Sequence, residues 1–194
     1  LLAADYSQIE LRVMAHLSED PDWITAFQAG EDIHARTASE VFGEGVVSDD
    51  LRRRAKEINF GIIYGMSAYG LAQRLGIDIA LAGEYIDLYF SRYARVREYI
   101  DQSLEKARSA GFVQTLFGRR RYVPNLGSKN RMVRMAAERV AINAPIQGTA
   151  ADLMKLAMIR VQDRLEGEER KAKLILQVHD EIVLELPFSE EDAV

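Results

Sequence analysis

Apolar residues recur at spacings of three and four along most of the chain, whereas short runs of Val, Ile and Leu stand near its two ends. The first pattern predicts helices, and short apolar runs bounded by turn residues predict strands. The expected helices cover residues 9–17, 21–27, 32–42, 51–64, 71–75, 81–93, 96–110 and 129–165, the last interrupted at Pro145 and Gly148. The pattern therefore predicts an α+β fold that is mostly helical.

The expected strands are short and lie mainly at the ends of the chain. Residues 1–6 read as a buried strand with Asp5 near its end, and residues 112–116 and 121–123 as a hairpin around Gly118. Residues 173–178 and 182–186 form a further pair, with only His179, Asp180 and Glu181 between them. Two carboxylates are thus expected on a tight turn.

Residues that favour helix ends stand next to several of these segments. Ser7 and Ser48 are candidate N-caps, because a serine hydroxyl can accept a bond from the first free N–H groups of a helix. Gly43 and Gly45 are expected to close the third helix, and Gly65 the fourth.

Composition and charge narrow the class of protein. The chain has no cysteine, which excludes disulfides, thiol nucleophiles and zinc–thiolate sites, and no run approaches eighteen apolar residues. The net charge is −5, but residues 1–50 hold two basic and eleven acidic side chains, a net of −9, while residues 112–139 hold seven basic and one acidic, a net of +6. This segregation favours metal-binding carboxylates facing a groove for an anion, with a random scatter of solvated charges as the alternative.

Two aspartates 175 residues apart are the candidates for metal binding. Asp5 ends one apolar strand and Asp180 sits at the tip of a hairpin, with Glu181 as a further carboxylate. Carboxylates on neighbouring strands can hold Mg²⁺ together with substrate phosphates, and paired metals serve phosphoryl transfer. The alternative is that both aspartates are ordinary turn and strand-end residues.

A second pattern runs along the helix that follows Ser48. Arg52, Lys56, Phe60 and Tyr64 recur every four residues, so they form one slowly drifting stripe about 18 Å long. Two cations followed by two rings match a nucleoside triphosphate in order and size. A helix with a basic exposed end and an aromatic core-facing end is the alternative.

A third pattern suggests a groove for nucleic acid. Arg139, Asn143 and Gln147 again stand four residues apart and supply donors for phosphates, sugars or minor-groove acceptors. Arg119 lies on the preceding hairpin among other basic residues. A solvated basic face is the alternative, but it does not explain an Asn and a Gln among apolar neighbours.

Three longer motifs resemble those of the family A DNA polymerases, the bacterial DNA polymerase I type. Residues 5–12, DYSQIELR, resemble motif A, and QVHDE at residues 177–181 resembles motif C. Arg52-x₃-Lys56-x₃-Phe60-Gly61-x₂-Tyr64-Gly65 resembles motif B, the fingers helix of that family. Segments at residues 32–34, 115–121 and 143–152 are similar too, and the resemblance covers essentially all 194 residues.

The resemblance implies a right-hand polymerase with a small antiparallel palm sheet and helical fingers. Residues 1–30 are expected to belong to the palm, residues 31–111 mainly to the fingers and residues 112–194 again to the palm. The thumb, the exonuclease domain and the C-terminal end of the palm are expected to be absent from this partial polymerase domain.

The resemblance also assigns roles to residues. Asp5 and Asp180 are expected to hold two Mg²⁺ ions, with the Tyr6 carbonyl in one site, Glu181 close by, and Lys56 assisting proton transfer to pyrophosphate. The nucleotide-binding residues it implies are Glu10 (against the 2′ position), His34, Arg52, Lys56, Phe60 and Tyr64. The DNA-binding residues it implies are Arg12, Arg119, Arg139, Asn143, Gln147 and His179.

The implied activity is template-dependent transfer of deoxynucleotides from dNTPs to a primer 3′-hydroxyl. The implied partners are primer–template DNA and dNTPs, with Mg²⁺ as cofactor and Mn²⁺ as a substitute, and no membrane. A monomer in the cytoplasm of a bacterial or phage-infected cell is expected. The alternative is a truncated, non-catalytic DNA-binding fragment, and a two-metal phosphohydrolase is disfavoured because the 52–64 stripe would lack a purpose.

Overall fold

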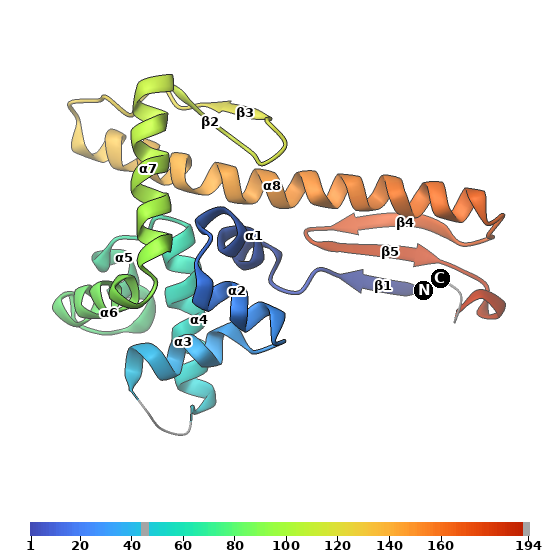
Figure 1. The fold of residues 1–194 in the computed structure, drawn as a ribbon, viewed down its shortest axis with the longest axis horizontal. Helices are drawn as coiled ribbons and strands as arrows, with labels where there is room; N and C mark the ends of the chain where they lie inside the picture. Colours follow the sequence, from blue (N-terminus) through green and yellow to red (C-terminus); the bar gives the residue numbers. More distant parts are fainter. Residues whose placement is uncertain (44–46, 192–194) are drawn as a thin grey trace.

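The computed structural model describes residues 1–43 and 47–191, and within them the fold is α+β, as expected. A long helix, α8, runs across the molecule; a sheet lies beside its C-terminal half, and the other helices gather around its N-terminal half (Figure 1). The elements are β1 (Leu2–Asp5), α1 (Ile9–Ser18), α2 (Pro21–Gln28), α3 (Ile33–Phe42), α4 (Asp49–Ile63), α5 (Ala68–Leu75), α6 (Ile79–Arg92), α7 (Ala94–Ala110), β2 (Phe112–Gln114), β3 (Arg120–Tyr122), α8 (Arg131–Gly167), β4 (Lys173–Val178), β5 (Glu181–Glu185) and a 3₁₀ turn at Phe188–Glu190.

The larger sheet joins the two ends of the chain. Its strand order is β1-β5-β4, and both pairings are antiparallel. One face packs on α8 through a cluster that includes Met154, Leu165, Ile182 and Leu184. The expectation of a buried strand at residues 1–6 was wrong, since Ala3, Ala4 and Asp5 are exposed. The reason is that α8 covers only one of the two faces of the sheet.

The helical half has its own core. Trp23, Tyr89 and Tyr93 are fully buried there, and the Trp23 and Tyr93 rings meet edge to face at 5.7 Å between centroids. Leu11 and Ile58 join the same cluster, which ties α1 and α2 to α4 and α6. The helices that carry the candidate residues are therefore held by one apolar core.

Helix α8 is continuous, although interruptions were expected at Pro145 and Gly148. A proline inside a helix removes one backbone bond and costs about 3 kcal/mol. Burial of Pro145 and of its neighbours Ile142 and Ile146 outweighs that cost. Gly148 is needed for close packing rather than for a break, because a Cβ there would lie 2.6 Å from Cγ2 of Thr115.

Some helix ends differ from the expected ones. Ser48 caps α4 by accepting the Leu51 N–H at 3.3 Å, but α4 begins at Asp49, earlier than predicted. Ser7 does not cap α1: Gln8 occupies the N-cap position in the left-handed conformation, and the Ser7 carbonyl accepts a bond from Arg12 Nε. Gly43 caps the C-terminus of α3 as expected, and Gly45 lies outside the described residues.

The strands are close to their predicted bounds. β4 agrees residue for residue, whereas β5 begins one residue earlier and includes Glu181, so the turn consists of His179 and Asp180. β2 and β3 are shorter or shifted by one residue relative to the expected hairpin. In the described part of the chain, every helix is too short or too polar to cross a membrane.

Candidate functional site

Three acidic residues lie at the same end of the larger sheet. The strand register sets Asp5, at the end of β1, opposite Glu181, at the start of β5. The Tyr6 N–H donates to the Asp180 carbonyl oxygen at 3.0 Å, which extends this pairing into the turn. Asp5 is exposed and Asp180 and Glu181 are half-buried, so residues at opposite ends of the sequence face solvent together.

The turn that carries Asp180 is held by a local bond. His179 adopts a left-handed conformation with φ of 53°, which a non-glycine residue rarely does without support. Gln177 Nε2 donates to the His179 carbonyl oxygen at 2.6 Å. The amide therefore stabilises the backbone that presents both His179 and Asp180.

These carboxylates suit a hard divalent cation that keeps other ligands. Within residues 1–43 and 47–191, no cluster of three acidic, His or Cys side chains could hold a metal alone. Mg²⁺ is bound in just such partial sets, through one or two carboxylates with waters and substrate phosphates completing the shell. The donors Asp5, Asp180 and the Tyr6 carbonyl fit that chemistry.

A cavity of about 370 Å³ opens beside the carboxylate edge. Its walls come from α1, α4, α8 and the β4–β5 turn. The polar and aromatic residues that line it are Glu10, Phe60, Tyr64, Gln147, His179 and Asp180. Side chains that three separate sequence patterns predicted thus share one cavity.

Glu10 and Tyr64 form a bond across this cavity. The Tyr64 hydroxyl donates to Glu10 Oε2 at 2.6 Å. Burial, followed by the hydrogen bond to Glu10 and its charge, raises the pKa of the Tyr64 phenol well above its usual value. The phenol stays protonated at neutral pH and keeps donating, which joins α1 to the C-terminal end of α4.

The stripe on α4 extends from this cavity toward solvent. The Phe60 and Tyr64 rings are stacked with centroids 6.0 Å apart and planes at 27°. One turn earlier, Lys56 is exposed, and a turn before that Arg52 Nε pairs with Asp32 Oδ2 at 2.6 Å. Two cations and two rings therefore follow each other along the helix as the sequence indicated.

His34 is packed behind the stripe. It is 2% exposed, its ring lies 5.8 Å from the Phe60 ring, and its Nδ1 lies 3.0 Å from Asn59 Nδ2. Burial lowers the pKa of His34 to about 4; Arg52 and Lys56 lower it as well, while Asp32 opposes them. The ring is neutral at pH 7, and with Nδ1 accepting from Asn59, the proton resides on Nε2.

The lowered pKa predicts an acid-dependent loss of stability. The unfolded chain protonates His34 near pH 6.5 and the folded chain near pH 4, so the free energy of unfolding falls as pH drops between those values. Between pH 7 and pH 5 the loss from this residue is about 2 kcal/mol. His34→Gln removes the titrating group and keeps a polar side chain.

Urea unfolding of both proteins at the two pH values measures the difference. The wild-type chain is expected to lose more stability than His34→Gln. Equal losses would contradict the assignment, because the carboxylates titrate alike in both proteins.

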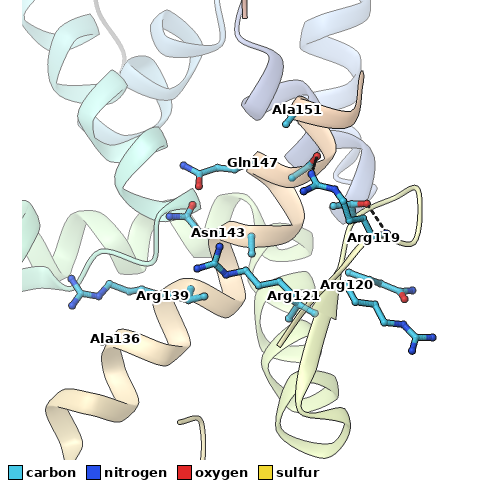
Figure 2. Close-up of a pocket in the computed structure, with 14 residues that line it drawn as sticks. Arg119, Arg120, Arg121, Ala136, Arg139, Asn143, Gln147 and Ala151 are labelled. Atoms are coloured by element: carbon cyan, nitrogen blue, oxygen red, sulfur yellow. Dashed lines mark hydrogen bonds between the residues drawn. The ribbon is translucent and has the colours of Figure 1, made fainter. Parts of the chain in front are cut away.

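A second cavity, of about 470 Å³, lies between the β2–β3 hairpin and α8. Arg139, Asn143 and Gln147 stand along one side of α8, and Arg121 reaches toward them from β3 (Figure 2). Arg120 points to the opposite face of the hairpin, where its guanidinium lies 4.6 Å from the centre of the Phe112 ring. Gln147 lines both cavities, so the two are neighbours along α8.

Gly65 sets the closest approach of α4 to this helix. Its φ is 63°, and a Cβ there would lie 3.0 Å from Ile142 Cδ1 and 3.2 Å from Arg139 Cγ. A side chain would be strained by its own backbone and would press on both neighbours. The glycine therefore allows the end of the α4 stripe to lie against the groove.

Two predicted DNA-binding arginines have protein partners. Arg12 donates to the Ser7 carbonyl and covers the Phe27 ring at 4.6 Å, away from the linings of both cavities. Arg119 lines the second cavity, yet its guanidinium bonds to Asp152 and to the Gly148 carbonyl. Their roles toward DNA stay predictions.

Sequence reasoning missed Asn59 and Asp152. Asn59 is fully buried between His34 and Thr37, and Asp152 pairs with Arg119. The sequence held a sign of each residue. Asn59 is a polar residue on the apolar side of α4, and Asp152 stands four residues after Gly148, on the same face of α8. Neither pattern names its partner, because the partners come from distant segments.

Comparison with known proteins gives consistent matches over the whole chain. The model of the family described as DNA polymerase family A matches residues 1–194. The chain is 55% identical to the thermostable DNA polymerase I of Thermus aquaticus over its full length, and 56% identical over 96% of its length to DNA polymerase I of Pseudomonas aeruginosa. It spans 23% and 21% of those two relatives.

A solved structure is also similar. The POL domain of Pol1 from M. smegmatis, in complex with DNA primer-template and dNTP, superposes with a TM-score of 0.94 at 48% sequence identity. The match covers 98% of this chain and 34% of that chain.

Proposed function

Because the chain belongs to DNA polymerase family A, we propose that it is the palm and fingers part of a DNA-directed DNA polymerase. The reaction is transfer of a deoxynucleotide from a dNTP to a primer 3′-hydroxyl. The observation that carries the proposal is the sheet edge with Asp5 and Asp180, which adjoins the cavity of Glu10, Phe60 and Tyr64. The similar M. smegmatis domain was solved with DNA primer-template and dNTP, which supports both substrates.

The proposed division into subdomains follows the elements that carry each set of candidate residues, since one apolar core ties α1 and α2 to α4 and α6. Residues 1–30 and 112–194 are assigned to the palm, since β1, β4 and β5 form the sheet that carries the carboxylates. Residues 31–111 are assigned mainly to the fingers, since α3 and α5 pack on α4, which carries the stripe, and α6 packs on α3 and α5. Nucleotide and primer would then meet where α4 approaches α8.

The metal-binding residues are Asp5, Asp180 and the Tyr6 carbonyl, with Glu181 next to them. Two bound Mg²⁺ ions would supply charge stabilisation for the attacking and leaving oxygens. Asp5 and Asp180 hold the charge that attracts these ions, and the register with β5 keeps both carboxylates at one edge.

The triphosphate-binding residues are Arg52, Lys56 and His34. Lys56 is exposed and positively charged, so it can neutralise phosphate charge and donate a proton to the departing pyrophosphate. Arg52 would exchange its exposed pairing with Asp32 for the stronger charge of a phosphate. His34 is a neutral Nε2–H donor by the same assignment, but it is 2% exposed, so a contact with phosphate would require the side chains that cover it to move.

The sugar and base contacts fall to the cavity residues. The Glu10 carboxylate, held by Tyr64, occupies space on the 2′ side, and Phe60 offers a ring to the sugar and base. Arg139, Asn143, Gln147 and His179 are assigned to the primer–template, together with Arg12. Their neutral and charged donors suit phosphates and minor-groove acceptors.

Primer extension tests the proposal. The chain is mixed with a labelled primer, templates that offer each base in turn, one dNTP at a time, and Mg²⁺ or Mn²⁺. Growth by one nucleotide with the complementary dNTP alone is expected. Duplex binding without growth would favour the non-catalytic fragment, and phosphate release without growth would favour a phosphohydrolase.

A further inference from the structure

The turn that joins β2 to β3 is seated directly on α8. The Leu116 N–H donates to Thr149 Oγ1 at 3.0 Å, and the Thr115 side chain lies where a Cβ on Gly148 would be. Within the turn, the Arg119 N–H donates to Thr115 Oγ1 at 3.2 Å. The turn therefore packs on α8 at Gly148 and Thr149.

Arg119 closes this contact with its guanidinium. Its Nε donates to Asp152 Oδ1 at 2.9 Å and its Nη2 donates to the Gly148 carbonyl oxygen at 2.9 Å. Figure 2 shows the Arg119 side chain reaching from the hairpin to α8. Two of its donors are thus used in bonds to the protein itself.

Asp152 is the unexpected member of this pair. It belongs to a helix whose groove residues would face a polyanion, where a negative charge opposes binding. Its side chain is 13% exposed, and Oδ2 is buried with no hydrogen-bond partner in the described part of the chain. Its partner Arg119 is 53% exposed, so this ion pair lies between an exposed surface pair and a buried one.

We propose that Arg119 is a positioning residue, which with Asp152 latches the β2–β3 hairpin onto α8 and so holds Arg121 over the groove. The proposal rests on the assignment of that groove to primer–template DNA. Arg121 follows Arg119 on the same face of the hairpin and reaches toward Asn143 and Arg139. When the latch opens, the turn of the hairpin is no longer tied to α8, and Arg121 loses its fixed distance from the helix.

Two roles are possible for Arg119, a direct phosphate contact or a latch to Asp152, and they predict opposite effects of a change at Asp152 on the affinity for DNA. Asp152→Asn removes a negative charge beside the groove, so it should tighten DNA binding if Arg119 is a direct phosphate contact. The latch predicts weaker binding, by about threefold to tenfold, which is the size of a lost charge-assisted contact. Asp163→Asn is the matched control, since it makes the same charge change at an exposed position of α8.

Dissociation constants for a labelled primer–template duplex are measured for the wild-type chain, Asp152→Asn, Asp163→Asn, Arg119→Ala and the double variant Arg119→Ala/Asp152→Asn. The latch predicts that both single variants weaken binding alike, and that the double variant is no weaker than either. Binding by Asp152→Asn that equals or exceeds that of Asp163→Asn overturns the proposal, as does additivity in the double variant.

Amide hydrogen exchange without DNA separates this proposal from the proposed function. In Asp152→Asn the Leu116 amide is expected to exchange faster than in the wild type and in Asp163→Asn, because the turn leaves Thr149. Unchanged exchange overturns the latch, whether or not the chain extends a primer. Faster exchange in a chain that binds no primer–template would retain the latch and reject the DNA assignment.

Discussion

Asp180→Asn is expected to reduce the rate of nucleotide incorporation by about a thousandfold or more. The change keeps the shape of the side chain and leaves the backbone bond from Tyr6 to residue 180 in place. It removes one of the two carboxylates assigned to the metal ions. Such ions stabilise the charge of the transition state by several kcal/mol. A loss of about 4 kcal/mol corresponds to a thousandfold lower rate. Asp5→Asn should behave in the same way.

Single-turnover extension of a labelled primer measures this loss. Glu185→Gln is a matched control, because it removes a carboxylate from β5, the strand that follows Asp180, at an exposed position at the other end of that strand. Binding of the primer–template should change little in either aspartate variant. A variant that retains more than about a tenth of the wild-type rate would remove that residue from the metal assignment.

Glu10→Ala is expected to relax selection against ribonucleotides by about tenfold to two-hundredfold, the range for one contact in a pocket. Glu10 projects into the cavity beside Asp180, and the Tyr64 hydroxyl fixes its carboxylate. Shortening the side chain opens room for a 2′-hydroxyl. The measurement compares incorporation of a ribonucleotide and of its deoxynucleotide by the same variant in single-turnover assays.

Tyr64→Phe separates the volume of Glu10 from its hydrogen bond. It deletes the same 2.6 Å bond but leaves the carboxylate in the cavity, so most of the discrimination should persist. If Tyr64→Phe relaxes selection as much as Glu10→Ala, the orientation of the carboxylate matters more than its bulk. If neither variant changes the ratio, the sugar is selected elsewhere.

Sequence reasoning reached the elements and the pairing of distant carboxylates, for identifiable reasons. β4 has a continuous apolar run with a short turn after it, so its bounds were predictable. The resemblance to motifs A and C singled out Asp5 and Asp180, and the strand register places Asp5 opposite Glu181, the residue after Asp180. The local sequence pattern was sufficient to predict an element wherever the residues that determine its bounds are neighbours in sequence.

The predictions failed where a distant segment decides the outcome. Pro145 should interrupt α8 by its own backbone chemistry, yet burial on both sides of it keeps the helix intact. The partner of Arg119 was not foreseen either, because Asp152 lies 33 residues later; whether Arg119 also contacts DNA stays a prediction. The exposure of Asp5 likewise depends on which faces of the sheet other elements cover.

Because α8 is continuous, it fixes both the distance and the rotation between the groove and the carboxylate edge of the sheet. Arg139 faces the groove, Gln147 lines both cavities and Met154 supports the sheet, all on one uninterrupted rod. Each residue of an α-helix adds about 1.5 Å and, at 3.6 residues per turn, about 100° of rotation. One residue inserted between Gln147 and Met154 would therefore turn the groove through more than a right angle relative to the carboxylates. An insertion or deletion is therefore expected to be tolerated in a loop of this chain but not inside α8, where the number of residues between Gln147 and Met154 must stay the same.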